Sequence, residues 1–257
     1  MSNIVRIPAF TDNYIWLSVD DRGNALVVDP GDARPVIDYL EQRQFNLTDI
    51  LITHHHPDHI GGVDELTKAY PNVNVFGPAT ERFPMVTVPC HALDDIEPIS
   101  GDHSYRVLEV PGHTTDHIAF YSAPNLFIGD TLFSAGCGRL FEGTPEQMLT
   151  SLTKLLTLPG DTKIYCAHEY TQANIEFAIN VTPNNKQLLS YKQQVEMLRK
   201  AGAATIPTIL ATEKLINPFL RTHQEDVIEG VRKKFDLKEE TSQLEIFSKL
   251  RAWKDTY

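Results

Sequence analysis

Short runs of apolar residues, each bounded by turn-forming residues, dominate the first two thirds of the chain. Runs of this length, rich in β-branched and aromatic side chains, predict β-strands. The second and third runs are joined by the polar turn "DDRGN", which is typical of a hairpin. The predicted strands are residues 3–9, 14–19, 25–29, 49–53, 72–76, 105–110, 117–122, 125–130 and 163–167.

Helical periodicity appears between these runs and then takes over. Residues 33–44 and 63–70 have a helical pattern, and Thr144, Pro145 and Gln147 occupy the N-cap, first-turn and capping-box positions of a helix that continues to about residue 156. From about residue 170 the pattern is mostly helical, over residues 171–180, 184–202 and 239–257. The sequence therefore predicts an α/β domain, residues 1–168, followed by a helical domain, residues 169–257.

Composition narrows the class of protein. The 257 residues are 42% hydrophobic and 22% charged, which is ordinary for a soluble globular chain. A formal net charge of −11 disfavours nucleic acid and anionic membranes as partners. The three cysteines form no CxxC pair, and the N-terminus lacks the pattern of a signal peptide. We expect a cytoplasmic monomer with reduced thiols and with neither a nucleic-acid nor a membrane partner.

Four of the apolar runs end in a side chain that can bind a metal. His54, His113, Asp130 and His168 each follow a predicted strand, and the first opens the dense cluster "HHHPDH". Because neighbouring strands of an α/β fold open their carboxyl ends onto one crevice, we expect these four side chains to converge. A single histidine at a strand end is more often structural, but four such ends together with the cluster predict a metal centre.

The spacing within the cluster supports a first metal site. If the chain stays extended beyond the strand, His54 and His56 point to one side and His55 to the other. With His113 they supply three imidazole nitrogens, the usual protein ligands of a catalytic zinc that keeps an open position.

The remaining ligand candidates predict a second metal site. Asp58 and His59 follow the stiff Pro57 and face a neighbouring point, where His168 completes a set of three. Asp130 has two carboxylate oxygens and can bridge both ions. Asp29, at another strand end, is expected to accept a hydrogen bond from a ligand imidazole, with a simple turn-forming role as the alternative.

Other histidines and cysteines are expected to be structural. His117 lies at the entry into a strand, which favours a core or hydrogen-bonded histidine over an additional ligand. Cys137 and Cys166 are expected to be buried thiols rather than ligands. Three further histidines lack ligand spacing: His91, His103 and His223.

At this point the sequence resembles a known family. "THHHPDHIGG", "PGHTTDH", "GDTLF" and "AHEY" resemble, in order and spacing, the motifs of the metallo-β-lactamase-fold hydrolases. The match is closer to the glyoxalase II family, the hydroxyacylglutathione hydrolases, and extends over "DNYIW", "GCGRLFEGT", "NPFLR" and "LRAWKD". The metal motif alone is typical of the whole superfamily, whereas the helical tail with its basic end narrows the choice.

The resemblance implies a fold and a reaction. The fold is an αββα sandwich of two mixed sheets followed by an α-helical domain. The cofactors are two divalent metal ions, expected to be zinc, although iron and manganese suit the same ligands. The resemblance implies the same two ligand sets as the spacing, with Asp130 as the bridging ligand. A hydroxide that bridges the metals would attack S-(2-hydroxyacyl)glutathione and release glutathione and a 2-hydroxycarboxylate, D-lactate in methylglyoxal detoxification. Asp58 is able to accept the proton of the hydroxide, but its expected main role is that of a metal ligand.

The resemblance also implies a glutathione site. The family's contact residues correspond to Arg139, Phe141, Tyr170, Arg251 and Lys254. Eukaryotic members carry lysine and tyrosine where this chain has Arg139 and Phe141, which points to the bacterial branch. Because Phe141 lacks a hydroxyl, a contact there must use its ring or backbone.

Other functions on the same fold remain alternatives. An iron persulfide dioxygenase also handles glutathione but generally uses one metal. A β-lactamase would need an export signal, a nuclease would need a less acidic surface, and a metal-binding protein without catalysis would not need a basic pair that receives a carboxylate. Hydrolysis of a glutathione thioester separates these functions. The residues specify neither the native metal nor the preferred acyl group.

Overall fold

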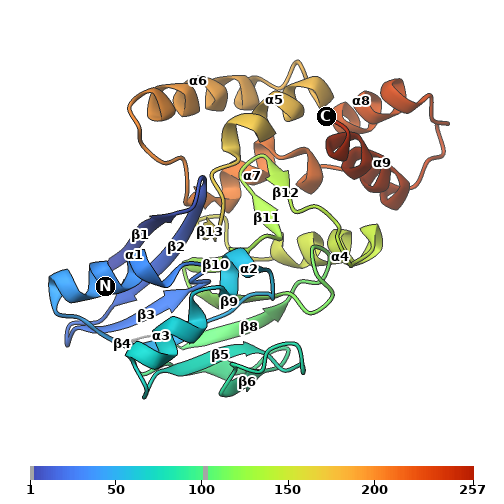
Figure 1. Cartoon of the computed structure of the whole chain (residues 1–257). Helices are drawn as coiled ribbons and strands as arrows, with labels where there is room; N and C mark the ends of the chain where they lie inside the picture. The colour runs from blue at the N-terminus through green and yellow to red at the C-terminus, as the bar shows by residue number, and fades with distance from the viewer. Residues whose placement is uncertain (1–2, 101–103) are drawn as a thin grey trace. The chain divides into compact units, whose positions relative to one another are not determined.

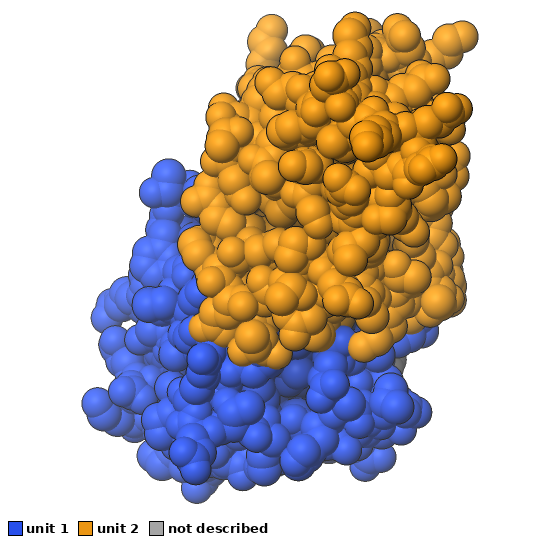
Figure 2. Space-filling model, turned by 90° about the vertical axis from the view of Figure 1, so that its right-hand side faces the viewer, with its two compact units in different colours: residues 1–109, 116–129 blue, residues 110–115, 130–257 orange. Residues whose placement is uncertain are grey.

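The structure is a computed structural model that describes residues 3–100 and 104–257. Two compact units divide the chain, the first formed by residues 1–109 and 116–129 and the second by residues 110–115 and 130–257 (Figure 2). These limits differ from the division at residue 168 that the sequence suggests, so that domain boundary stays a prediction.

A six-stranded mixed sheet forms one layer of the first unit. Its strands lie in the order β1-β2-β3-β4-β5-β6. The first three pair antiparallel, and the hairpin of β2 and β3 is the one that the turn "DDRGN" predicts. Strands β3 to β6 pair parallel. The strands are β1 (Asn3–Ala9), β2 (Asn13–Val19), β3 (Asn24–Val28), β4 (Asn46–Leu51), β5 (Asn74–Pro78) and β6 (Val88–Cys90).

Two helices cover one face of this sheet. Helices α1 (Ala33–Arg43) and α3 (Val63–Ala69) lie beside this sheet (Figure 1). Their apolar residues form one core cluster with alternate positions of the strands. Leu26, Val28 and Leu51 occupy the other positions of the central strands and are also fully or nearly fully buried. Since successive side chains of a strand point to opposite faces, both faces of the sheet are covered. Burial on both faces explains why these strands read as continuous apolar runs.

A second set of strands in the same unit packs near the end of β4. It consists of β7 (Asp95–Ile96), β8 (Tyr105–Glu109), β9 (Ile118–Ser122) and β10 (Asn125–Gly129), paired antiparallel. The backbone N–H of Ile118 donates to the carbonyl of Thr53 at 3.0 Å. Gly129 has a φ of 51°, and a Cβ there would lie 2.3 Å from Thr53 Oγ1. The approach of the two layers therefore requires glycine directly before Asp130.

The second unit is mostly helical. Its elements are β11 (Leu132–Phe133), β12 (Gly136–Cys137), α4 (Pro145–Leu155), β13 (Lys163–Cys166), α5 (Thr171–Val181), α6 (Lys186–Lys200), β14 (Thr208–Ile209), α7 (Leu210–Ile216), the 3-10 helix η1 (Pro218–Leu220), α8 (Glu225–Phe235) and α9 (Gln243–Asp255). The predicted capping box of Thr144 and Gln147 is present in full at the start of α4. A cluster that includes Ile175, Leu188 and Ile216 forms a core of α5, α6 and α7.

A buried carboxylate joins helix α7 to the β11–β12 hairpin. Glu213 accepts hydrogen bonds from Ser134 Oγ, the Ala135 N–H and Thr208 Oγ1. Burial is the main cause that raises the pKa of Glu213, and these donors oppose the shift. A fully hydrogen-bonded network of this kind holds the hairpin that directly follows Asp130.

The predicted fold, mixed sheets in an α/β arrangement with a helical C-terminal region, is confirmed. The predicted strands and helices are all present, with bounds shifted by up to four residues. Among the described residues, no helix is long and apolar enough to cross a membrane.

Candidate metal centre

The histidine cluster lies where β4 ends and a short helix begins. His54 follows the strand, and His56 is the N-cap of α2 (Pro57–Ile60), which carries Asp58 and His59. A Cβ at Gly31 would lie 1.9 Å from the backbone oxygen of Asp58. The turn that follows β3 therefore packs directly against the backbone of α2. This contact fixes the position of the helix that carries Asp58 and His59.

Asp29 holds two of the histidines through hydrogen bonds. Its Oδ1 accepts from the Thr53 N–H at 2.8 Å, and its Oδ2 accepts from Thr53 Oγ1 at 2.7 Å. His59 Nδ1 lies 3.0 Å from the same Oδ2, and His54 Nδ1 lies 3.0 Å from Thr53 Oγ1. Because the Thr53 hydroxyl proton goes to Asp29, its oxygen is left to accept from His54 Nδ1–H. Both imidazoles therefore keep the Nε2 lone pair for a ligand.

Ligand atoms in the first unit have the separations that one metal ion imposes. Two donors bound tetrahedrally at the usual zinc–nitrogen distance lie roughly 3.3 Å apart. His54 Nε2 lies 3.2 Å from His56 Nδ1, and His59 Nε2 lies 3.5 Å from Asp58 Oδ2. Each pair therefore fits a separate cation.

The second unit supplies three more candidate ligands with matching geometry. Asp130 Oδ2 lies 3.4 Å from His113 Nε2 and 3.4 Å from His168 Nε2. His113 Nδ1 lies 2.8 Å from the carbonyl of Arg139, so Nδ1–H donates and Nε2 keeps its lone pair. One carboxylate oxygen thus faces two imidazoles that the sequence assigns to different metals.

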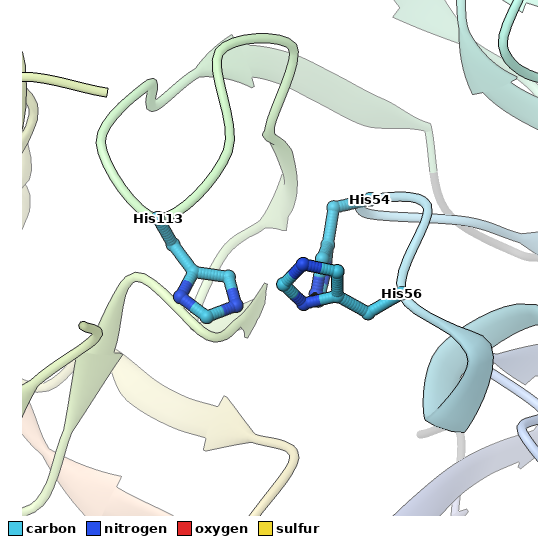
Figure 3. A group of neighbouring side chains, drawn as sticks. All are labelled: His54, His56 and His113. Atoms are coloured by element: carbon cyan, nitrogen blue, oxygen red, sulfur yellow. Dashed lines mark hydrogen bonds between the residues drawn. The ribbon is translucent and has the colours of Figure 1, made fainter. Parts of the chain in front are cut away.

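Among the described residues, four groups of side chains have the composition of metal ligands, and the ligand atoms within each lie within 4.8 Å of one another. Three of them consist of His54 with His56 and His113 (Figure 3), Asp58 with His59 and His168, and Asp29 with His54 and His59. The fourth, His55 with Asp116 and Glu142, shares no residue with these three. The first two are the sets that the sequence predicts. In the third, the hydrogen bonds of Asp29 account for its position behind the imidazoles.

The other histidines have different surroundings. His55 Nδ1 lies 3.6 Å from Asp116 Oδ1. His117 is buried, its Nδ1 lies 3.0 Å from the carbonyl of Ile118, and its ring stacks on His54. This is the environment expected of a core histidine. His91 and His223 are exposed, and His103 lies outside the described residues.

The cysteines behave as buried thiols. Cys137 and Cys166 are buried, and burial raises the pKa of both thiols above its ordinary value. Burial also raises the pKa of Cys90, to about 12. A thiol that resists ionisation is a poor metal ligand, in agreement with the structural role expected of these cysteines.

Aromatic and basic side chains surround the ligands of the second unit. Phe141 is 61% exposed, and its ring meets that of His113 edge-on at 5.3 Å. Tyr170 is 38% exposed and stacks on His168 at 4.7 Å. Arg139, also exposed, reaches Asp255 at the end of α9 with Nε 3.3 Å from Oδ1. Two open aromatic surfaces and a cation therefore lie beside the candidate ligands.

The basic pair of α9 differs from the simple exposed pair that helical spacing suggests. Arg251 is only 5% exposed, and its Nη1 donates to the carbonyl of Cys137 at 2.7 Å while its Nη2 lies 3.1 Å from Asp255. Lys254 is partly buried, and its Nζ donates to the carbonyl of Ala173 at 3.2 Å. The two residues are therefore not a solvated basic helix end.

Two residues of the site have roles that the sequence analysis does not predict. Thr53 links Asp29 to His54, and the amide of Asn13 donates to Asp58 Oδ2 at 3.0 Å. Thr53 directly precedes the histidine cluster, which is a local signal for its role. Asn13 lies 45 residues before its partner, so no local pattern connects them.

Family models match nearly the whole chain. Residues 11–168 match the model of the metallo-beta-lactamase superfamily, and residues 169–257 match that of the hydroxyacylglutathione hydrolase C-terminus. The chain is 51% identical over 257 residues to a hydroxyacylglutathione hydrolase of Aliivibrio fischeri, with 100% of both chains covered.

Two solved structures extend the comparison. ETHE1 from Myxococcus xanthus has a TM-score of 0.67 at 23% identity, with 100% of this chain and 99% of that chain covered, which shows the fold alone. TTHA1623, solved in a di-iron-bound form, has a TM-score of 0.53 at 27% identity over 65% of this chain and 91% of its own. With its whole length matched by a curated relative and residues 11–257 matched by two family models, the chain belongs to the hydroxyacylglutathione hydrolase family of the metallo-β-lactamase superfamily.

Proposed function

We propose that the chain hydrolyses S-(2-hydroxyacyl)glutathione, such as S-D-lactoylglutathione, to glutathione and a 2-hydroxycarboxylate at a centre of two divalent metal ions. The reaction follows from the family, and the metal count and residue roles are our proposal. The proposed ligands are His54, His56 and His113 for one ion, Asp58, His59 and His168 for the other, and Asp130 for both.

The position of Asp130 carries the proposal of two ions. Its Oδ2 lies 3.4 Å from the Nε2 atoms of both His113 and His168, one from each proposed ligand set. A carboxylate has lone pairs for two cations, so Asp130 is able to serve both proposed ligand sets at once. The neighbour TTHA1623, which holds two irons, supports the same count. We propose zinc as the metal, and the histidine and carboxylate ligands also suit iron and manganese.

The chain's own residues prepare the centre for this chemistry. When bound, two cations supply an activated water at neutral pH and polarise the carbonyl that the water attacks. Asp29 contacts His59 directly and His54 through Thr53, and the Arg139 carbonyl contacts His113. These contacts fix the tautomer in which Nε2 carries the lone pair that binds a metal. The thiolate of glutathione leaves without help from an acid, so the site needs no separate proton donor.

The aromatic and basic residues of the second unit are the proposed substrate contacts. Phe141 and Tyr170 present open rings beside His113 and His168, which suits the acyl and thioether parts of the substrate. Arg139 and Lys254 offer positive charge to the carboxylates of glutathione. Arg251 also belongs to the proposed substrate contacts. It is a buried cation whose charge acts on the neighbouring Lys254.

A persulfide dioxygenase is the other reaction proposed from the sequence. The similarity to ETHE1 is 23% identity, whereas the full-length identity to a hydroxyacylglutathione hydrolase is 51%. Only the fold follows from the first comparison, so the hydrolase is favoured. Two assays separate the two reactions. A hydrolase removes the thioester absorbance of S-D-lactoylglutathione, whereas a persulfide dioxygenase consumes oxygen when glutathione persulfide is offered.

A pair of variants tests the bridging role of Asp130. We expect Asp130→Asn to lower metal occupancy and turnover by orders of magnitude, because a neutral amide cannot bridge two cations as a carboxylate does. His55→Ala is the matched control within the cluster and should keep metal content and turnover near those of the wild type. If His55→Ala loses metal while Asp130→Asn retains it, the proposed ligand assignment is wrong.

The three free cysteines are all buried, which supports a chain that works in a reducing compartment. We propose a cytoplasmic monomer. Sedimentation of the purified protein tests the monomer, since a dimer would double the sedimenting mass.

A further inference from the structure

Asn13 makes a long-range hydrogen bond to a proposed metal ligand. It begins β2, pairs with Ala9 across the β1–β2 hairpin, and is 7% exposed. The loop between them contains Phe10 with a φ of 51°. From this position Asn13 Nδ2 donates to Asp58 Oδ2 at 3.0 Å. The hairpin thus brings a fixed amide to a side chain 45 residues later in the chain.

The side chain of Asp58 can take more than one orientation. It belongs to the first turn of a four-residue helix, and its side chain is 39% exposed. An aspartate in this setting can rotate about χ1 into solvent. The oxygen that Asn13 contacts is also the one that lies 3.5 Å from His59 Nε2. The amide therefore selects the orientation in which Asp58 and His59 share a cation.

We infer that Asn13 is a positioning residue that holds Asp58 as a ligand of the metal ion shared with His59. The inference rests on the proposed function, in which Asp58 is a ligand. A neutral amide suits this role, because it donates a hydrogen bond without the positive charge that would repel a cation. The carboxylate keeps further lone pairs for the metal. Groups that orient metal ligands typically contribute about 10- to 100-fold to metal affinity.

The test is a metal titration of the full-length protein in competition with a chromophoric chelator. Metal-free wild type and Asn13→Ala are titrated with Zn²⁺ and, for the absorption spectrum, with Co²⁺. We expect Asn13→Ala to bind one ion as the wild type does and the other about 10- to 100-fold more weakly. The Co²⁺ spectrum should change for the weakened ion only.

Two further variants make the result specific. Thr11→Ala alters an exposed residue of the same hairpin loop and should leave both affinities within twofold of wild type. Asn13→Asp keeps the size of the side chain but replaces the donor by a second carboxylate, so it should weaken the same ion. Thermal unfolding of the metal-free forms should give similar midpoints for wild type and Asn13→Ala, which separates metal positioning from a general loss of stability.

Two results overturn the inference: both ions bound by Asn13→Ala within twofold of wild type, or Thr11→Ala weakened to the same extent. Failure of the proposed function looks different. In that case the wild type itself binds fewer than two ions or leaves S-D-lactoylglutathione intact.

Discussion

At the scale of single residues, the site depends on groups that fix the tautomers of His54, His59 and His113. Asp29 Oδ2 accepts a hydrogen bond from the Thr53 hydroxyl and lies 3.0 Å from His59 Nδ1, and Thr53 Oγ1 in turn lies 3.0 Å from His54 Nδ1. One buried carboxylate therefore sets two imidazoles. Its backbone has a φ of 51°, which aspartate tolerates better than most residues.

Thr53→Val tests this chain of hydrogen bonds. Valine keeps the shape of the side chain but leaves His54 Nδ1–H without its acceptor and removes a donor from Asp29. We expect metal affinity to fall by about tenfold or more and the free energy of unfolding to fall by about 1–3 kcal/mol. Chelator competition and denaturant unfolding measure the two effects.

Thr182→Val is the matched control, because Thr182 is an equally buried threonine whose hydroxyl donates only to the Ala178 carbonyl among the described contacts. It should lose some stability but no metal affinity. Equal losses of metal affinity in the two variants would contradict the role of Thr53.

The sequence reveals the candidate ligands but only part of what holds them. Alternation along an extended chain assigns His54 and His56 to one side, and the structure has their nitrogens 3.2 Å apart. Asn13 carries no such signal, because its partner Asp58 lies 45 residues away in the chain, and Thr53 is marked only by its place directly before the cluster. The burial of Arg251 is equally hidden, since helical spacing gives its neighbours on α9 but not the Cys137 carbonyl that it meets.

At the scale of elements, α9 ties the C-terminal region to the residues beside His113. Asp255 lies 3.1 Å from Arg251 Nη2 and 3.3 Å from Arg139 Nε, and the Arg139 carbonyl faces His113. Arg251 is thus a structural member of the helix, and Lys254 is the residue of the pair better placed to meet a substrate carboxylate. Arg251→Ala should therefore cost stability in addition to any loss of binding.

The pH dependence of KM tests Lys254. Burial, followed by the charge of Arg251, lowers the pKa of Lys254 below its ordinary value of 10.5. The charged ammonium group therefore lowers the free energy of unfolding at a pH below the lowered pKa of Lys254. This loss of stability disappears as the pH rises through that pKa. A substrate carboxylate needs the charged form, so KM should rise with pH before 10.5 is reached.

Two variants isolate this effect. Lys254→Ala should raise KM for S-D-lactoylglutathione about tenfold at neutral pH, with a smaller change in kcat, since a charge-assisted contact contributes roughly 1.5–3 kcal/mol. Lys254→Arg should bind at neutral pH and lose the alkaline rise, because arginine stays charged. A wild-type rise in KM that persists unchanged in Lys254→Arg would assign it to another group.

Helices and strands are predictable from the sequence where a hydrophobic pattern extends over most of the element. Strands β3, β4 and β5 and helix α4, with its capping box, follow directly from apolar runs and cap residues, whereas β6, with three residues, is not predicted. Helix α8 did not stand out, because Gly230 interrupts it and its N-cap makes no side-chain hydrogen bond. A Cβ at Gly230 would lie 2.1 Å from the Val181 carbonyl, so tertiary packing requires the residue that weakens the local signal. Helix α2, with four residues, is too short for any periodicity.

At the scale of the whole molecule, the account depends on seven ligands acting as two sites. Each unit contributes donors whose mutual distances, 3.2–3.5 Å, suit one cation per pair. The net charge of −11 favours bound cations over anionic macromolecules. Loss of the ions should therefore remove both activity and part of the stability of the folded chain.

The most direct test of the two-ion centre is the number of metal ions per chain that restores full activity. Metal-free protein is titrated with Zn²⁺ while hydrolysis of S-D-lactoylglutathione is followed and bound metal is measured on the same samples. The two-ion centre predicts no hydrolysis without metal and a plateau at two ions per chain. Full activity at one ion per chain, or without metal, would contradict it.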